Sequence, residues 1–355
     1  MAKKVIKTIA WILAGIVVVI VLFFGVLFLA KYNPEDVETV SQAQTGTKTL
    51  SIGDSVKIMT WNTGYASLGE TADFFMDGGS MVKTANADQV EENVDSILEV
   101  IKEQDPDVVF LQEVDLNSSR SNHINQYAEY EEALNDEYVD TFAYNFKVLY
   151  IPYPIPNMGQ VNSGLATFQK YSLIDSQRIQ LYCPFNTFVA AFNLRRCLMV
   201  NRVQIEDSDK ELVIINVHLE AYDSGEGKAK QTEQLKEFIE TEYEKGNYVI
   251  AGGDFNQVFS NVDTSAYPKI SDDMWMPAEI DTSVFDNFSA VTDAMAPTCR
   301  SLDKVYVGAD KSNFQYYVID GFLVSDNLQI DSIENLDLDF VNSDHNPIVL
   351  NVTLK

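Results

Sequence analysis

The sequence contains few cysteines, and their number is odd. Cys183, Cys197 and Cys299 are the only three in 355 residues, which excludes a framework of several disulfides. Two alternatives remain open. One is a single bond between Cys183 and Cys197, which would require a hairpin in this region. The other, which we favour, is three small buried apolar side chains, because free cysteine is among the most buried residue types.

Basic residues are also scarce. The chain has 25 Lys and Arg against 53 Asp and Glu, which gives a formal net charge of -28. A strongly acidic surface repels polyanions, and tight binding of nucleic acid without sequence preference requires clustered basic side chains. The charge therefore argues against such binding. It does not exclude nucleic acid as a substrate, because a bound cation can reverse the local field.

Charge is absent from one long stretch near the N-terminus. The residues from Thr8 to Ala30 carry no charge and are apolar after Thr8. As a helix they would span about 35 Å, enough to cross a hydrocarbon core of about 30 Å. A cleaved signal peptide is the alternative, but its apolar region is usually shorter, and Phe28 stands where a cut after Ala30 requires a small residue. We therefore expect residues 1–30 to be an uncleaved transmembrane anchor.

The charges that flank this stretch predict its orientation in a cell membrane. Three lysines precede it, and the segment that follows it is acidic. Under the positive-inside rule the N-terminus is cytoplasmic and the rest of the chain is extracellular. Residues 31–50 are polar and show no apolar periodicity, so they are expected to be a linker. Residues 51–355 then form the catalytic domain, and no feature predicts a protein partner.

The domain begins with a predicted β-strand, helix and second strand. Residues 57–61 form an apolar run, residues 88–104 have apolar side chains at helical spacing, and residues 107–111 form another apolar run. Two strands joined by a helix are usually parallel. A second helix is expected at about residues 228–245. Further runs of strand length lie at about 141–150, 163–169, 177–182, 196–204, 211–217, 248–251, 316–324, 328–334 and 347–353.

Many strands and few helices, with no internal repeat, favour an α/β (α+β) fold of two packed sheets flanked by helices. The apolar runs share one further property, which is that polar residues able to bind a metal or move a proton lie at their ends, after most of the runs and directly before the last one. These residues are Asn62, Glu113, His218, Asp254 with Asn256, Asp320, and Asp344 with His345.

Each of these polar residues has an ordinary explanation when it is taken alone, such as a solvated turn or a satisfied core histidine. Their combination is more informative, because two of only three histidines and four carboxylates stand at the ends of apolar runs. Oxygen ligands with few cysteines suit a hard cation such as Mg²⁺ or Mn²⁺ rather than structural zinc. The pattern predicts a polar site at one edge of a rigid sheet core.

Six segments together resemble the endonuclease/exonuclease/phosphatase superfamily, which includes DNase I-like and sphingomyelinase-like enzymes. The resemblance covers about residues 55–355 in the order of the family, and it implies a four-layer α/β sandwich of two mixed β-sheets. The segments are Thr60-Trp61-Asn62, Leu111-Gln112-Glu113, Asn216-Val217-His218-Leu219, Gly253-Asp254-Phe255-Asn256, Ile319-Asp320-Gly321-Phe322 and Ser343-Asp344-His345-Asn346-Pro347.

The resemblance also implies a role for each of these side chains. Glu113 corresponds to the principal metal ligand, with Asn62 and Asp344 beside it. His345 corresponds to the catalytic histidine that activates water, and Asp320 orients it. The remaining residues are implied to position that water and to bind the phosphate; they are Asp254, Asn256 and His218. The implied activity is metal-dependent hydrolysis of a phosphate ester.

The substrate stays open at this point between nucleic acid, a phospholipid headgroup and a small phosphoester. Residues 216–219 depart from the Asn-x-Tyr-x-Pro pattern of the superfamily's abasic-site endonucleases. Asn145 is a weaker candidate for substrate binding, because it lies in a strand-like run without a motif of its own. A rival hypothesis is a catalytically silent, membrane-anchored binding protein of the same fold. It would be expected to lack Glu113, Asp254 or His345, and the chain has all three.

Overall fold

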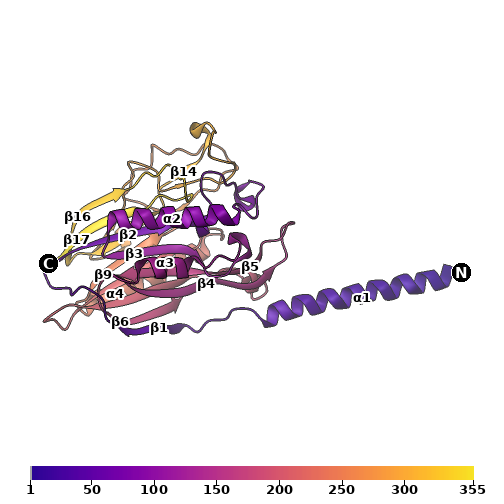
Figure 1. The fold of residues 1–355 in the computed structure, drawn as a ribbon, viewed down its shortest axis with the longest axis horizontal. Coiled ribbons are helices and arrows are strands. Elements are labelled where there is room, and N and C mark those ends of the chain that lie inside the picture. Colours follow the sequence, from indigo (N-terminus) through magenta and orange to yellow (C-terminus); the bar gives the residue numbers. More distant parts are fainter. Residues whose placement is uncertain (1) are drawn as a thin grey trace.

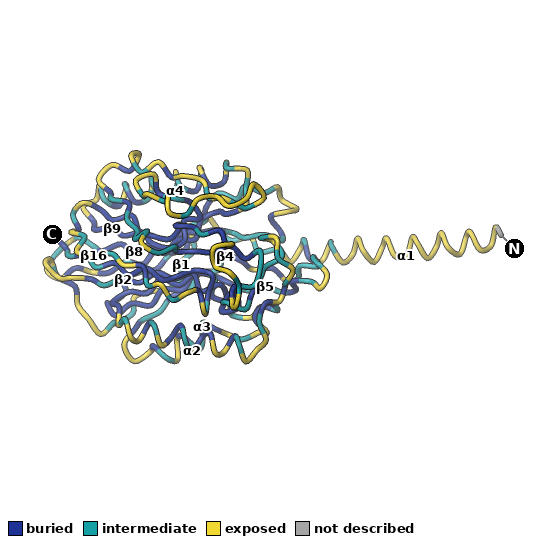
Figure 2. The backbone as a smooth tube through the Cα atoms, turned by 90° about the horizontal axis from the view of Figure 1, so that it is seen from above, coloured by how far each residue is buried: buried dark blue, intermediate teal, exposed yellow. Residues whose placement is uncertain are grey.

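The computed structural model describes residues 2–355 as a β-sandwich domain preceded by one long helix. Helix α1 projects away from the domain, as Figure 1 shows, and is exposed along almost its whole length (Figure 2). The helices are α1 (Ala2–Leu29), α2 (Ala87–Gln104), α3 (Gln126–Leu134) and α4 (Glu226–Glu244).

Two mixed sheets form the centre of the domain. The first has seven strands in the order β1-β6-β7-β8-β9-β15-β12, which are Val37–Gln44, Leu173–Gln180, Cys197–Gln204, Glu211–His218, Tyr248–Asp254, Asp320–Ser325 and Phe288–Val291. The second has six strands in the order β16-β17-β2-β3-β5-β4, which are Leu328–Asn335, Ile348–Leu354, Ser55–Asn62, Val108–Asp115, Gly159–Gln169 and Val139–Ile151. Two small sheets pair β10 (Gln257–Phe259) with β11 (Ala278–Ile280) and β13 (Cys299–Arg300) with β14 (Tyr316–Tyr317).

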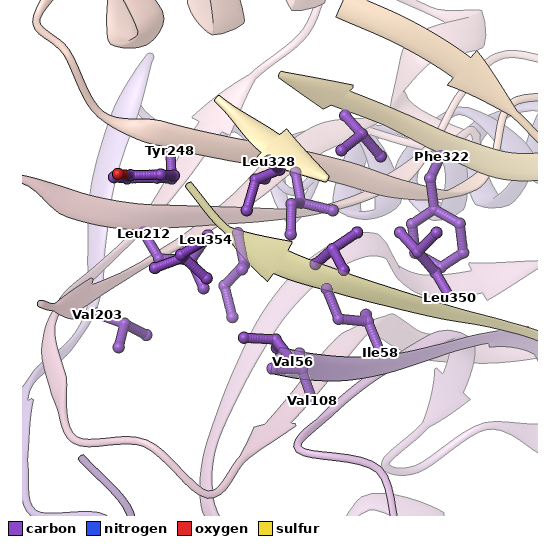
Figure 3. Packing of buried hydrophobic residues seen from close by; sticks show 14 of the residues in the cluster. Val56, Ile58, Val108, Val203, Leu212, Tyr248, Phe322, Leu328, Leu350 and Leu354 are labelled. Atoms are coloured by element: carbon purple, nitrogen blue, oxygen red, sulfur yellow. The ribbon is translucent and has the colours of Figure 1, made fainter. Parts of the chain in front are cut away.

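The apolar side chains divide the domain into four layers. Val56, Ile58 and Val108 from the six-stranded sheet pack between the sheets against residues such as Leu212 and Phe322 from the seven-stranded sheet (Figure 3). Side chains alternate along a strand, so the other residues of each strand face outward and must be covered by helices. Helices α2 and α3 cover the six-stranded sheet, and α4 covers the seven-stranded sheet (Figure 2).

The structure confirms the predicted sandwich and the parallel strand pair joined by a helix. Strands β2 and β3 are parallel, with Ile58 opposite Val108, and α2 connects them. Helix α2 begins after Asn86, whose side chain accepts a hydrogen bond from the Gln89 amide and so satisfies one free N–H of the first turn. Its buried face consists of Val90, Asn93, Val94, Ile97, Leu98 and Ile101.

One expectation about the segment before the domain was wrong. Residues 31–50 were expected to be a linker without structure, but Val37–Gln44 forms β1 and pairs antiparallel with β6. A strand at the edge of a sheet is held by main-chain hydrogen bonds and needs few apolar side chains. The sequence VETVSQAQ therefore gave no apolar periodicity to detect, and β1 belongs to the folded domain.

Other differences are smaller. The run at 316–324 is two strands, because the chain leaves β14 and enters the large sheet only at Asp320. Helix α3 was not predicted, since its nine residues bury only Gln126, Tyr130 and Leu134. All three cysteines are free, with Cys197 and Cys299 buried and Cys183 half-buried, so the favoured alternative holds for two of them.

Candidate active site

The predicted site residues gather at one edge of the sandwich, where several strands end or begin. Strands β2, β8 and β9 end there with Asn62, His218 and Asp254, and Glu113 lies two residues before the end of β3. Strand β15 runs antiparallel to β9 and begins there, so that Asp320 lies opposite Asp254. Asp344 and His345 precede β17, whose first residue pairs with Thr60 near the end of β2. The register of the two sheets thus brings the six segments together.

Glu113 reaches this edge because β3 is irregular at that position. The pairing of β3 with β5 shifts between Leu111 and Val114, and Glu113 has a φ of 58°. A bulge of this kind breaks the alternation of side chains and redirects one of them. The Glu113 carboxylate is 24% exposed and lies 3.8 Å from the guanidinium of Arg120. It is therefore accessible and placed beside one fixed positive charge.

Asp254 lies between two imidazoles. Its Oδ2 atom is 3.4 Å from Nε2 of His218 and 3.9 Å from Nε2 of His345. The same oxygen accepts a hydrogen bond from Asn62 at 3.0 Å, and Oδ1 accepts one from the Asn256 backbone amide at 2.8 Å. Burial and the nearby charge of Asp320 raise the pKa of Asp254 to about 7. This carboxyl group is thus poised to exchange a proton near neutrality.

Close packing directly before Asp254 explains why residue 253 is a glycine. Gly253 has a φ of 148°, and a Cβ atom on it would lie 2.0 Å from the carbonyl oxygen of Val217. A side chain at this position would push β9 away from β8 and displace Asp254 from His218.

His345 and Asp320 form a buried pair. Nδ1 of His345 lies 2.9 Å from Oδ2 of Asp320, and the His345 carbonyl accepts a hydrogen bond from the Trp61 indole at 2.8 Å. Burial alone would lower the pKa of His345, but the Asp320 carboxylate outweighs it and raises this pKa well above the usual value. The imidazole is therefore held in its charged form and in one orientation.

His218 has the opposite electrostatic character. Burial, together with the positive charges of Arg196, His345 and Arg120, lowers the pKa of His218 well below its usual value. Its Nδ1 atom is buried and has no hydrogen-bond partner among the described residues. The site thus pairs one charged imidazole with one neutral imidazole, which can donate a hydrogen bond without carrying charge.

Asp344 and Glu113 have the properties of a hard-cation site. The Oδ1 atom of Asp344 is buried and finds no hydrogen-bond partner among residues 2–355. Burial raises the pKa of Asp344 to about 6, and repulsion from Glu113 and Asp77 acts in the same direction. A buried carboxylate oxygen without a partner, surrounded by other carboxylates, is stabilised by a divalent cation. The residues present therefore fit the predicted Mg²⁺ or Mn²⁺.

Two tighter groups of potential ligand atoms are less suitable for such a cation. In each group the atoms lie within 4.8 Å of one another, and both groups include His345. One adds Asp254 and Asp320, but the imidazole is already hydrogen-bonded to Asp320. The other adds Asp344 and Cys299, and burial raises the pKa of the Cys299 thiol to about 12, which makes this thiol a poor ligand for a hard cation. Neither group is therefore a better site for a hard cation than Asp344 with Glu113.

The two predicted asparagines outside the Gly-Asp-Phe-Asn segment differ in their placement. Nδ2 of Asn62 faces Asp254 at 3.0 Å and Glu113 at 3.4 Å, and its Oδ1 accepts a hydrogen bond from the Gly64 amide. Asn62 therefore orients the two carboxylates, with its own oxygen already in use. Asn145 lies at an irregularity of β4, and its Nδ2 atom is buried without a partner among the described residues.

Four residues around the site were not among the predicted site residues. The buried Arg120 is held by Asp115 at 3.0 Å, and its guanidinium lies 3.7 Å from the centre of the Tyr65 ring. The Tyr222 hydroxyl donates a hydrogen bond to Asp77 at 2.9 Å. Burial raises the pKa of Asp77 to about 6, with a further contribution from Glu113. Nothing local in the sequence links Tyr65 or Tyr222 to the site.

Comparisons with known proteins agree with this arrangement. A model of the Endonuclease/Exonuclease/phosphatase family matches residues 59–339. Among solved structures, the endonuclease/exonuclease/phosphatase from Beutenbergia cavernae DSM 12333 superposes with a TM-score of 0.56 at 19% identity, over 84% of this chain and 72% of that one. The protein of the same description from Bacteroides vulgatus has a TM-score of 0.53 at 16% identity, over 85% and 100% of the two chains.

The catalytic domain of human Nocturnin with bound sulfate anion has a TM-score of 0.51 at 18% identity, over 85% of this chain and 94% of that one. These identities are low, so the three structures establish a shared fold and nothing more. No sequence among the curated proteins matches the chain.

Proposed function

Because the chain belongs to the Endonuclease/Exonuclease/phosphatase family, we propose that it is a divalent-metal-dependent hydrolase of phosphate esters, anchored in a membrane by α1. Members of this family are generally phosphoester hydrolases that depend on a divalent metal. One observation carries the proposal for this chain. Asp254 lies between the charged His345 and the neutral His218, and the residue before His345, Asp344, has a buried oxygen without a partner among the described residues.

The proton chemistry follows from the opposite pKa shifts of these groups. With a pKa of about 7, Asp254 can accept a proton from an attacking water. His345 donates Nδ1–H to Asp320 and keeps Nε2–H for the developing negative charge of the phosphoryl group. The sequence pattern had placed the proton acceptor on His345. The raised pKa of that imidazole favours Asp254 as the acceptor and His345 as the charged donor.

The remaining side chains bind and orient. His218 and Asn256 both approach Oδ2 of Asp254, at 3.4 and 3.2 Å. The His218 imidazole is a donor suited to a phosphoryl oxygen, whereas the Asn256 amide also donates to the Leu219 carbonyl and so holds Asp254 in place. Glu113 and Asp344 are the residues that would hold the metal, and Asn62 fixes the Glu113 carboxylate relative to Asp254. When bound, a divalent cation neutralises the phosphate charge and polarises the phosphoryl oxygen. Buried, fixed donors of this kind cost little reorganisation in the transition state.

Helix α1 determines the proposed location. Among residues 2–355 it is the one helix long and apolar enough to span a membrane, a property that it shares with signal sequences. The absence of a suitable cleavage site and the lysines before it support a retained span with a cytoplasmic N-terminus. The catalytic domain would then lie outside the cell membrane.

The test uses the full-length chain in lipid nanodiscs with Mg²⁺ or Mn²⁺. The substrates are supercoiled DNA, single-stranded RNA, sphingomyelin and soluble phosphomonoesters. We expect hydrolysis of one class, and we expect EDTA or the change His345→Ala to abolish it. His123→Ala is the matched control, because His123 is exposed and bonded to Asn117. A folded chain that binds a phosphoester but cleaves none would instead support the catalytically silent binding protein.

A further inference from the structure

The edge of the sandwich that carries the proposed active site also carries the membrane helix. Strand β1 pairs with β6 so that its first residue, Val37, lies opposite Ile179 near the end of β6. Strand β6 ends beside Cys197, where β7 begins, and Leu198 lies opposite Val217 next to His218. Helix α1 therefore enters the domain at the edge where His218 ends β8, and Figure 1 shows it leaving opposite the C-terminus.

Two connections lie at the same edge for the same reason. Strand β4 is antiparallel to β5, which is antiparallel to β3, so the turn at residues 152–158 projects beyond the end of β3 that carries Glu113. The connection at residues 181–196 joins the end of β6 to the start of β7. Both connections are thus close to the point where α1 meets the domain.

Side chains of α1 contact these parts of the domain directly. The Phe23 ring centre is 6.0 Å from that of Tyr150, and the Phe24 ring centre is 6.4 Å from those of Phe188 and Phe192. Phe23 precedes the last residue of α1 by about 9 Å along the helix axis. If the apolar part of α1 spans the bilayer, the domain residues that touch Phe23 and Phe24 lie at the level of the membrane interface.

The end of β4 and the same two connections expose large apolar side chains. Ile155 is 95% exposed, Tyr153 71%, Phe188 54% and Leu149 51%. The Tyr153 ring also approaches Phe75, with 6.4 Å between ring centres. Phe75 begins the short helical turn that ends at Asp77, which hydrogen-bonds to Tyr222 beside the site. The exposed apolar surface thus extends from α1 to the rim of the active site.

We propose that this surface, formed by Leu149, Tyr153, Ile155 and Phe188, inserts into the membrane interface and turns the active site towards the bilayer. The substrate would then be the phosphoester headgroup of a membrane lipid. This inference rests on the proposed function for its chemistry and on α1 being retained as a membrane span. We infer that lipid contacts this surface because the surface is continuous with α1. Partly apolar loops that are rich in aromatic residues and lie beside a membrane helix are typical of the membrane interface.

The negative charge of the chain limits which lipid headgroups can be its substrate. The chain has a net charge of -28, so the approach of the domain to a strongly anionic surface is unfavourable. The site rim also carries the neighbouring carboxyl groups of Asp77, Glu113 and Asp344. A bound divalent cation would offset the charge of Glu113 and Asp344 locally, but the net negative charge of the rest of the domain still disfavours a headgroup with excess negative charge and tolerates one that also carries a cation. A zwitterionic phosphodiester headgroup is therefore the expected substrate.

The first experiment measures depth in the membrane and does not depend on activity. The full-length chain is reconstituted in nanodiscs of phosphatidylcholine with or without bromine on the acyl chains. Tyr153→Trp is compared with Ile52→Trp, because Ile52 is also exposed (58%) but lies in the turn before β2, at the opposite edge. We expect brominated lipid to quench the added fluorescence at position 153 and not at position 52. Equal quenching at both positions would overturn the proposal.

The second experiment measures turnover in vesicles of phosphatidylcholine and sphingomyelin with Mg²⁺. We expect Ile155→Asp to lower release of the phosphorylated headgroup by about five- to tenfold, and to leave hydrolysis of the soluble analogue p-nitrophenyl phosphorylcholine unchanged. Ile52→Asp, the same substitution at the far edge, should change neither rate. Equal loss on both substrates, or cleavage of nucleic acid in place of lipid, would contradict the lipid assignment. Selective quenching without hydrolysis of any phosphoester would contradict the proposed function and leave the membrane-facing surface standing.

Discussion

At the scale of single residues, the site depends on side chains in conformations that the sheet alone would not provide. Glu113 has a φ of 58° at a bulge, and Asn256 has a φ of 51° after the end of β9. Positive φ values cost a non-glycine residue of the order of 1 kcal/mol or more, and they persist where the surrounding structure fixes them. The fold thus accepts local strain in order to direct Glu113 and Asn256 towards Asp254.

Glu113→Gln should abolish metal-dependent hydrolysis while the domain stays folded. The substitution removes the charge of a partly exposed carboxylate at the edge of β3 and leaves its size unchanged. We expect activity to fall at least about a hundredfold, because the metal loses a charged ligand. The measurements are turnover at saturating Mg²⁺ and thermal unfolding. Glu99→Gln, on the exposed face of α2, is the control, and unchanged turnover in Glu113→Gln would refute the assignment.

Asp320→Asn tests the positioning of His345. The asparagine can still hydrogen-bond, but it no longer stabilises the charged imidazole. We expect kcat to fall by about 10²- to 10⁴-fold, with KM changed by less than about twofold. Asp326→Asn is the control, because Asp326 is exposed at the opposite end of β15. A rise in KM with kcat preserved would show that Asp320 serves substrate binding instead.

At the scale of elements, one ion-pair network joins α4 to the sheet that it covers. Arg202 of β7 lies 2.8 Å from Glu242 of α4 and 2.8 Å from Glu211 of β8. Asn247, before β9, donates a further hydrogen bond to Glu242 at 2.9 Å. Burial alone would raise the pKa of Glu242, but the bonds from Arg202, Lys245 and Asn247 lower it to about 2. The network fixes the end of α4 over three neighbouring strands.

Glu242→Gln should therefore destabilise the domain in a pH-dependent manner. A carboxyl group with a lowered folded pKa stabilises the fold above its unfolded pKa of about 4.5 and loses this effect as the pH falls towards 2. We expect the substitution to cost about 2 kcal/mol at pH 7, after allowance for the partial exposure of Arg202. Urea unfolding at pH 7, 5 and 3 measures the difference from the parent chain, which should shrink at pH 3. A constant difference would contradict this account, and the exposed Glu237→Gln is the control.

At the scale of the whole molecule, α1 and the sandwich form one functional unit. Helix α1 is exposed along its length except where its last turns contact the domain, and Leu27 there is 5% exposed. Strand β1 follows directly and is part of the seven-stranded sheet. Only about seven residues separate α1 from β1, so the domain is held close to the membrane surface whenever α1 spans the bilayer.

The chain should accordingly stay in the membrane fraction after expression in a bacterium. We expect it to resist extraction with alkaline carbonate and to keep its N-terminal residues, as measured by intact mass. Val18→Arg, near the centre of α1, should reduce membrane insertion, because an arginine there costs about 2.5 to 3.5 kcal/mol. Val341→Arg, on the exposed surface of the domain, should have no effect. A soluble product shorter by about 30 residues would instead identify α1 as a signal peptide.

The sequence by itself determined the class of fold and the candidate chemistry. Apolar runs placed β2, α2 and β3 correctly, and the polar residues at the ends of such runs made Glu113, Asp254 and His345 candidates for the site. This worked because a buried strand and the polar residue that follows it are both local properties of the chain. The sequence did not reveal β1, because an edge strand depends on its partner β6 rather than on its own apolar residues.

Only the tertiary structure decided the electrostatic environment of each candidate site residue. Two histidines at the ends of apolar runs look alike in sequence, yet Asp320 raises the pKa of one while burial and Arg196 lower that of the other. Likewise, no local pattern connects Tyr153 and Ile155 with α1, although sheet register brings them to the same edge. Electrostatic environment and strand register are set by residues distant in sequence, so they emerge only when the chain has folded.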